Sequence, residues 1–149
     1  MIVRKMLANE LDTTFMLFNN YYKDEIVEIN PNLFQDYDEN SMVETIRNHS
    51  ISYEMFWANA YEGQRPVGFI GGFLSACPWN KQLVFANISY IYLLKSHRNK
   101  ENLKMLMDEF NAWAKLINAV RAISTDNEIF AESFKQMEYT SEMLMTKEL

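Results

Sequence analysis

The sequence predicts an α+β domain in which helices flank a central mixed sheet. Six segments either alternate between apolar and polar residues or are rich in β-branched and aromatic residues, as strands are. Other segments repeat their apolar residues at helical spacing. One helix separates two of the strands, and a crossover of that length makes them parallel, whereas short turns make neighbouring strands antiparallel. With 149 residues, 48% of them hydrophobic, and no linker or repeat, the chain is expected to form one domain, residues 1–149.

The first third of the chain predicts a strand and two helices. Residues 2–7 alternate in polarity and are expected to form a short strand. From Leu11 to about Glu25 the apolar positions recur at helical spacing, with Asp12 in the first turn, where a carboxylate favours the helix dipole. Pro31 and the Asn and Asp residues near it favour a turn, and a second helix is expected over residues 41–48.

The middle of the chain predicts a hairpin followed by a long central strand. Residues 53–61 place alternate side chains on two faces, and the next strand, residues 67–75, follows a tight turn. Gly71 and Gly72 lie inside this second strand and predict a bulge or a close backbone approach. After a loop over residues 77–81, residues 82–94 become apolar on both faces towards their end, as expected of a buried strand.

The last third predicts a helix, a strand, a helix and a strand. The first helix ends near Asn118, a residue that tolerates the left-handed cap position. Residues 119–125 should then lie parallel to the strand before the helix. A last helix is expected over residues 126–139 and a final strand over 141–149. The apolar stripe of the first helix consists of Leu103, Met107, Phe110, Ala114 and Ile117.

Composition limits the classes of function. The net charge of −6 argues against a generic nucleic-acid binder, because affinity for a phosphate backbone depends on Lys and Arg. A single cysteine, Cys77, cannot form an internal disulfide, and with two histidines it cannot build a usual structural zinc site. Neither a secretory signal nor a membrane span is apparent, so a cytoplasm-like compartment and no membrane partner are expected.

One stretch of this acidic chain is locally basic. Within ten residues, where an apolar strand gives way to an amphipathic helix, the chain has five basic residues: Lys95, His97, Arg98, Lys100 and Lys104. Many phosphate-binding turns lie at such a position. These side chains either bind an anion or are solvated turn residues, and charge alone does not decide between the two. A nucleic-acid binder would need aromatic side chains near residues 95–104 on which nucleobases could stack, and this stretch has none. This argues again against nucleic acid.

The order of elements and three local motifs resemble the GNAT superfamily of acetyl-CoA-dependent N-acetyltransferases. The stretch "RPVGFIGGFLS" resembles the family's third strand. The stretch "YLLKSHRNKENLKMLMDEFNAWAKLINAVRAIST" resembles its strand-turn-helix unit, most closely in a form typical of phage-encoded members. Asn127, Phe134 and "MEYT" follow at the spacing of its last helix. The resemblance covers the chain from about Arg65 onward and implies a GNAT-like acyl-CoA N-acyltransferase fold.

The resemblance implies a site for acetyl-CoA. The parallel strands should splay at their C-terminal ends, where the backbone of Leu93 and Leu94 would bind the pantetheine arm. In the family a glycine-containing turn binds the pyrophosphate through backbone N–H groups. Here Asn99, Glu101 and Leu103 stand where small residues are expected, and Glu101 would repel the phosphates. The coenzyme-binding residues implied by the resemblance are Leu93, Leu94, Arg98, Asn99, Lys100, Asn102, Leu103, Asn127 and Phe134.

The catalytic groups depart further from the family. The position of the tyrosine that many members use to protonate the thiolate is Phe134, which has no proton to donate. Among carboxylates that could act as the base, Glu54 on the hairpin is our candidate, with Asp126 and Glu128 as alternatives. Asn87 and Ser89 are expected opposite Ala86, Ile88 and Tyr90 and do not titrate usefully. His49 is interpreted as a helix-end residue.

Two functions of different classes therefore stand. The first is acetyl transfer from acetyl-CoA to a small-molecule or protein amine. The second is a GNAT fold that has lost catalysis and serves as a structural or protein-interaction module, for example in a phage, in the host cytoplasm or the virion. The missing glycines and tyrosine favour the second, and the unchanged order and spacing of the elements favour the first.

Overall fold

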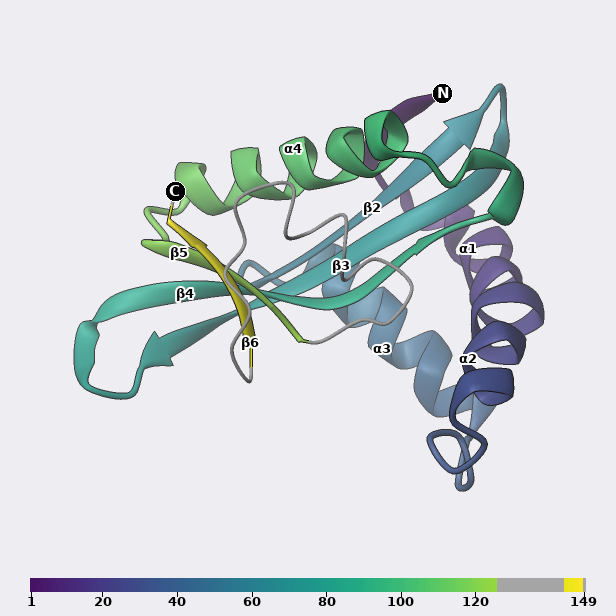
Figure 1. Ribbon diagram of the computed structural model, residues 1–149, viewed down its shortest axis with the longest axis horizontal. Helices are drawn as coiled ribbons and strands as arrows, with labels where there is room; N and C mark the ends of the chain where they lie inside the picture. The colour runs from purple at the N-terminus through teal and green to yellow at the C-terminus, as the bar shows by residue number, and fades with distance from the viewer. Residues whose placement is uncertain (126–143, 149) are drawn as a thin grey trace.

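A six-stranded sheet forms the centre of the molecule in the computed structural model, which describes residues 1–125 and 144–148 (Figure 1). The strands lie side by side in chain order, and β4 and β5 are parallel while the other neighbouring pairs are antiparallel. The sheet is therefore mixed, as the sequence predicts. Its strands are β1 (Ile2–Lys5), β2 (Met55–Glu62), β3 (Arg65–Cys77), β4 (Asn80–Leu93), β5 (Arg121–Thr125) and β6 (Leu144–Glu148).

Helices cover both faces of this sheet (Figure 1). On one face α1 (Leu11–Leu17), one turn of π-helix (Phe18–Tyr22) and α2 (Lys23–Ile29) follow one another without leaving helical backbone angles, and α3 (Glu39–Ile51) lies beside them. The other face is covered by α4 (Lys100–Leu116). Short 3₁₀ turns, Ala8–Glu10 and Lys95–His97, precede α1 and α4.

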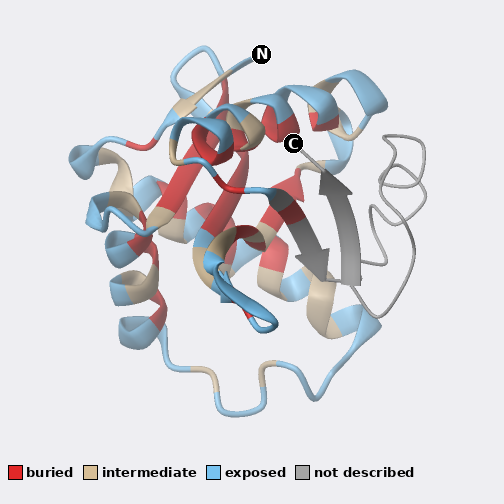
Figure 2. Ribbon diagram, turned by 90° about the vertical axis from the view of Figure 1, so that its left-hand side faces the viewer, coloured by how far each residue is buried: buried red, intermediate tan, exposed pale blue. Residues whose placement is uncertain are grey.

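Each face of the sheet has its own core, and Figure 2 shows the buried residues gathered along the strands and on the inner sides of the helices. The core beneath α4 contains Leu103, Met107, Phe110 and Ala114, so the predicted apolar stripe is confirmed, and Ile117 packs at its margin. The core beneath α1–α3 is aromatic and contains Phe18, Tyr22, Trp57, Phe69 and Tyr92.

Both predictions for the glycine pair are confirmed. The β3–β4 register shifts between Gly71, which pairs with Tyr90, and Gly72, which pairs with Ile88, so Ser89 is an extra, bulged residue. A Cβ atom at Gly71 would lie 2.7 Å from the Trp57 ring, and one at Gly72 would lie 2.4 Å from the Phe110 ring. Only residues without a side chain fit here, because β3 is covered closely on both faces.

The bulge corrects one prediction about side-chain directions. Simple alternation places Tyr90 on the face opposite Ser89. Because the extra residue breaks the alternation, Tyr90 instead packs in the α1–α3 core against Phe18, and Ser89 bonds to His49 of α3 on the same side. Both side chains of the bulge therefore face the same helices.

The remaining differences concern where elements begin and end. The first helical segment continues to Ile29 rather than Glu25, and α3 is longer at both ends than the predicted 41–48. The predicted 77–81 loop is only the turn Pro78–Trp79, so β3 and β4 form a long hairpin. Asn118 has a φ of 60°, which confirms the left-handed cap. The helix predicted over residues 126–139 lies outside the described residues.

Candidate functional site

The central feature of the site is an open strand edge where β4 and β5 part. Their pairing ends at Ile88 and Ser124, while β4 continues through Leu93. The Leu94 N–H donates to the Val67 carbonyl of β3 at 2.9 Å. Because backbone groups alternate between the two edges of a strand, those of Leu93 and Ile91 point away from β3. Among the described residues, no strand pairs with this edge beyond Ile88.

The α4 N-terminus lies just beyond this edge and is capped by Asn99. The Asn99 side chain accepts from the Asn102 N–H at 2.8 Å, and the Asn102 amide donates to the His97 carbonyl at 2.8 Å. With φ at −141°, Asn99 is extended and serves as a cap, not as a left-handed substitute for glycine. Within the described part of the chain, nothing accepts from the N–H groups of Lys100 and Glu101. Leu103 is fully buried in the α4 core.

Arg98 holds the end of β4 against α2. Its guanidinium donates to both carboxylate oxygens of Glu25, at 2.7 and 3.0 Å, and to the Leu93 carbonyl at 2.8 Å. Tyr92 donates to the same carboxylate at 2.9 Å. The sequence predicts a coenzyme contact for Arg98, but here its charge already faces a carboxylate. Glu25 lies 73 residues earlier in the chain, so no local pattern identifies it as the partner.

These contacts determine the protonation states of Glu25 and Tyr92. Burial raises the pKa of the Glu25 carboxyl, but the hydrogen bonds from Arg98 and Tyr92 and the charges of Arg98 and Lys95 outweigh it, so this pKa lies below its ordinary value. Burial and the Glu25 carboxylate both raise the pKa of the Tyr92 hydroxyl. Glu25 is therefore an anion and Tyr92 a neutral donor near pH 7, and neither exchanges a proton easily.

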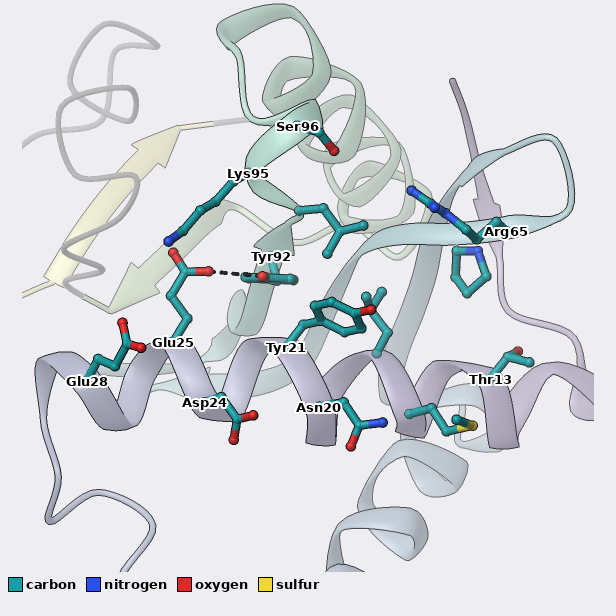
Figure 3. A pocket seen from close by; sticks show the side chains of 14 residues that line it. Thr13, Asn20, Tyr21, Asp24, Glu25, Glu28, Arg65, Tyr92, Lys95 and Ser96 are labelled. Carbon is teal, nitrogen blue, oxygen red and sulfur yellow. Dashed lines mark hydrogen bonds between the residues drawn. The ribbon is translucent and has the colours of Figure 1, made fainter.

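A pocket of about 700 Å³ lies between α1–α2 and the end of β4 (Figure 3). Figure 3 shows Lys95 extending towards Glu25 and Arg65 approaching from the start of β3. Three carboxylates, Asp24, Glu25 and Glu28, and two cations, Arg65 and Lys95, line the pocket. Exposed Met16 and Tyr21 add apolar surface.

The structure does not bring every predicted residue to the open edge. Glu54 is exposed at the start of β2, and its backbone carbonyl accepts from Leu74 of β3. Since β2 and β4 are separated by β3, this backbone is about 10 Å from β4. The N–H of Leu94 belongs to the β3 pairing, which leaves Leu93 as the edge residue. Asn127, Phe134, Asp126 and Glu128 lie outside the described residues.

One pair that the sequence does not reveal lies directly at the bulge. His49 is buried, with only 6% of its surface exposed, and its Nε2 is 3.0 Å from the Ser89 Oγ. Its Nδ1 is 2.7 Å from the Thr45 carbonyl oxygen. Burial lowers the pKa of His49, although the Thr45 carbonyl opposes this, so the ring is neutral at pH 7. The interpretation of His49 as a helix-end residue is correct for its position and misses this partner.

The described residues fit acetyl-CoA. An unpaired strand edge offers the Leu93 N–H to an amide of the pantetheine arm, and the α4 N-terminus offers the N–H groups of Lys100 and Glu101 to phosphate oxygens. Lys95 and Lys100 add positive charge next to this turn. The Glu101 carboxylate repels phosphates, and Arg98 is already paired with Glu25, so both weaken phosphate binding at the N-terminus of α4. Neither blocks it.

A mixed sheet whose central parallel strands part beyond a bulge, with a helix N-terminus at the open end, defines the GNAT acetyltransferase fold, and solved structures of that fold are similar to this chain. A predicted acetyltransferase from Clostridium acetobutylicum, solved with acetyl-CoA, has a TM-score of 0.78 at 15% identity, over 94% of this chain and 90% of its own. The aminoglycoside 6′-N-acetyltransferase AAC(6′)-IG from Acinetobacter haemolyticus has a TM-score of 0.71 at 14% identity, over 100% of this chain and 94% of its own. A GNAT-family acetyltransferase from Streptococcus pneumoniae has 0.70 at 12%, over 99% of each chain.

At these identities the likeness shows the fold, and the predicted α+β, GNAT-like class is confirmed. No protein-family model matches the sequence. No curated protein matches it either. Across residues 1–125 and 144–148, no helix has both the length and the apolar character needed to cross a membrane.

Proposed function

We propose that this protein is an N-acetyltransferase that moves an acetyl group from acetyl-CoA to an amine. The observation that carries the proposal is the open edge of β4, which begins at the bulge and leads to the N–H groups of Lys100 and Glu101, for which no described residue is an acceptor. Sheets rarely leave a central strand unpaired, because exposed backbone groups invite pairing. A ligand that carries both amide groups and phosphates would bind the open strand edge through its amides and the N-terminus of α4 through its phosphates.

The residues divide into those that hold the coenzyme and those that face the acceptor. The coenzyme, when bound, supplies an acetyl group activated as a thioester. The Leu93 backbone would orient its pantetheine arm, and the α4 N-terminus with Lys100 would hold its phosphates. These contacts act mainly through positioning, which by itself contributes much of the rate of a reaction between two bound reactants.

The acceptor is proposed to be a primary amine of a small molecule or a protein. The pocket beside α2 carries Asp24 and Glu28 in addition to the paired Glu25, so its carboxylates exceed its cations. This charge favours a cationic ligand over an anionic one. Amine acetylation is also the reaction named for the aminoglycoside 6′-N-acetyltransferase of the same fold.

The test uses two exposed side chains of opposite charge on the first turn of α4, Lys100 and Glu101. If phosphates bind at this N-terminus, Lys100→Gln should weaken acetyl-CoA binding about threefold to tenfold, and Glu101→Gln should strengthen it by a similar factor, as expected for one exposed charge. Lys115→Gln, at the opposite end of the helix, is the matched control and should change nothing. Isothermal titration calorimetry at low salt measures all three.

The opposite effects expected of Lys100→Gln and Glu101→Gln, together with the Lys115→Gln control, distinguish phosphate binding at this helix end from a general effect of protein charge. Equal effects of Lys100→Gln and Lys115→Gln would place the phosphates elsewhere. Absence of acetyl-CoA binding at millimolar concentration would refute the enzyme and favour the alternative, a GNAT fold kept as a structural or protein-interaction module, for example of a phage. The specific observation that favours this alternative is the engagement of Arg98 by Glu25.

A further inference from the structure

A serine and a histidine that are 40 residues apart in the chain meet at the point where the sheet opens. Ser89 is the extra residue of the β4 bulge and directly follows Ile88, the last residue of β4 that pairs with β5. His49 reaches it from the last turn of α3, across β3. Bulges commonly re-aim one side chain next to an active site.

The hydrogen bonds fix the position of each proton. The Thr45 carbonyl can only accept, so His49 Nδ1 carries the ring hydrogen and donates it. A neutral imidazole with hydrogen on Nδ1 accepts at Nε2, so the Ser89 hydroxyl donates to it. Among the described residues, no group donates to the Ser89 oxygen, so its lone pairs are available to another donor. This is the arrangement in which an imidazole draws a proton through a hydroxyl.

The surrounding residues are shaped around this contact. Gly71 lies between Trp57 and the bulge, and a Cβ atom there would come within 3.4 Å of Ser89 Oγ and 2.7 Å of the Trp57 ring. The Trp57 and Tyr90 rings pack against the imidazole, with centroids 5.6 and 6.0 Å away. A side chain at position 71 would therefore push these groups apart.

Few titratable groups face the imidazole from the packed elements. Tyr90 meets it from β4, and burial raises the pKa of that phenol, so it stays neutral. Lys5 of β1 and Tyr53, two residues before β2, line a cavity of about 280 Å³ together with His49. Among the described residues, no carboxylate bonds to the ring. A proton that arrives on His49 is thus stabilised mainly by the Thr45 carbonyl and returns readily.

We infer that Ser89 takes the proton that the acceptor amine loses and passes its own hydroxyl proton to His49. The inference rests on the proposed acetyl transfer and on an acceptor that extends from the pocket beside α2 to the bulge, where β4 and β5 part. As the amine nitrogen bonds to the acetyl carbon, the amine loses one proton to Ser89 Oγ, and the Ser89 proton moves to His49 Nε2. The C–S bond breaks, and its electron pair leaves on sulfur. The same path in reverse gives the sulfur one proton, so protons balance and His49 ends neutral.

The test compares Ser89→Ala, which removes the hydroxyl, with Ser89→Thr, which keeps it. Ser50→Ala is the matched control, because Ser50 follows His49 on α3 and its hydroxyl, among the described residues, bonds only to the Arg47 carbonyl. Thiol release from acetyl-CoA is measured with n-butylamine, lysine and spermidine as acceptors between pH 5 and 9. Ser89→Ala should lower kcat about 100-fold with little change in the KM for acetyl-CoA, and it should remove the His49 limb of the pH profile. Ser89→Thr and Ser50→Ala should keep that limb.

A second readout does not depend on turnover. In ¹⁵N-labelled protein, ring correlations distinguish His49 from His97, and the structure predicts hydrogen on Nδ1 of His49, with a Nε2 signal that changes in Ser89→Ala. Hydrogen on Nε2 would overturn the relay whatever the activity. Full activity of Ser89→Ala would overturn it while leaving the transferase intact. Absence of acetyl-CoA binding, or of turnover with all three amines, would overturn both.

Discussion

Replacing Gly72 with alanine tests whether the bulge is held by packing on the α4 face. The new Cβ atom would lie 2.4 Å from Phe110 Cε2 and 2.7 Å from the Asn87 carbonyl oxygen. Phe110 is completely buried, with Phe56 and Trp113 rings 6.1 and 5.6 Å away, and a carbonyl oxygen of the ladder cannot rotate aside. We therefore expect a loss at the upper end of overpacking, about 3 kcal/mol.

The assay is urea and thermal unfolding followed by circular dichroism. For a domain of this size about 3 kcal/mol corresponds to a Tm lowered by roughly 6–12 °C. Gly63→Ala is the control, because apart from its chain neighbours no described residue has an atom within 4 Å of its Cβ position, and its φ of +63° opposes the change by about 1 kcal/mol. A Gly72→Ala protein no less stable than Gly63→Ala would refute the packing argument.

Two further predictions concern single residues. The hydrogen bonds from Arg4 lower the pKa of Glu10 to about 2 against the opposing effect of burial, so the pair stabilises the fold above pH 4.5 and loses this contribution as pH falls towards 2. Glu10→Gln should flatten that part of the stability–pH curve, and an unchanged acid limb in urea titrations would contradict this. Asn99→Ala removes the α4 cap and should lower the free energy of unfolding by about 1 kcal/mol, whereas Asn99→Asp should keep it; an Asn99→Ala protein as stable as the original would show that the cap is unimportant.

Local patterns predicted the parts of the fold that depend on nearby residues. The glycine pair indicated the bulge, Asn118 indicated the end of α4, and the length of the crossover indicated that β4 and β5 are parallel. Each of these follows from the backbone preferences of a few residues or from the connection between two elements.

The side-chain pairs of the site could not be predicted in this way. Arg98 contacts Glu25, and Ser89 contacts His49, because α2 and α3 pack on the face of the sheet that the Arg98 and Ser89 side chains reach. Alternation also fails at a bulge, so the direction of Tyr90 was wrong. Asn99 could either cap a helix or take a left-handed conformation, and only the structure decides for the cap.

The contact between Arg98 and Glu25 carries an evolutionary consequence. Loss of either residue alone would leave a mostly buried charge facing no opposite charge from the other, which is more destabilising than the absence of both. Selection should therefore treat the two positions as one unit. In sequences that descend from a common ancestor with this chain, we expect the arginine and the glutamate to persist together or to be replaced together, even where the rest of the basic turn has drifted.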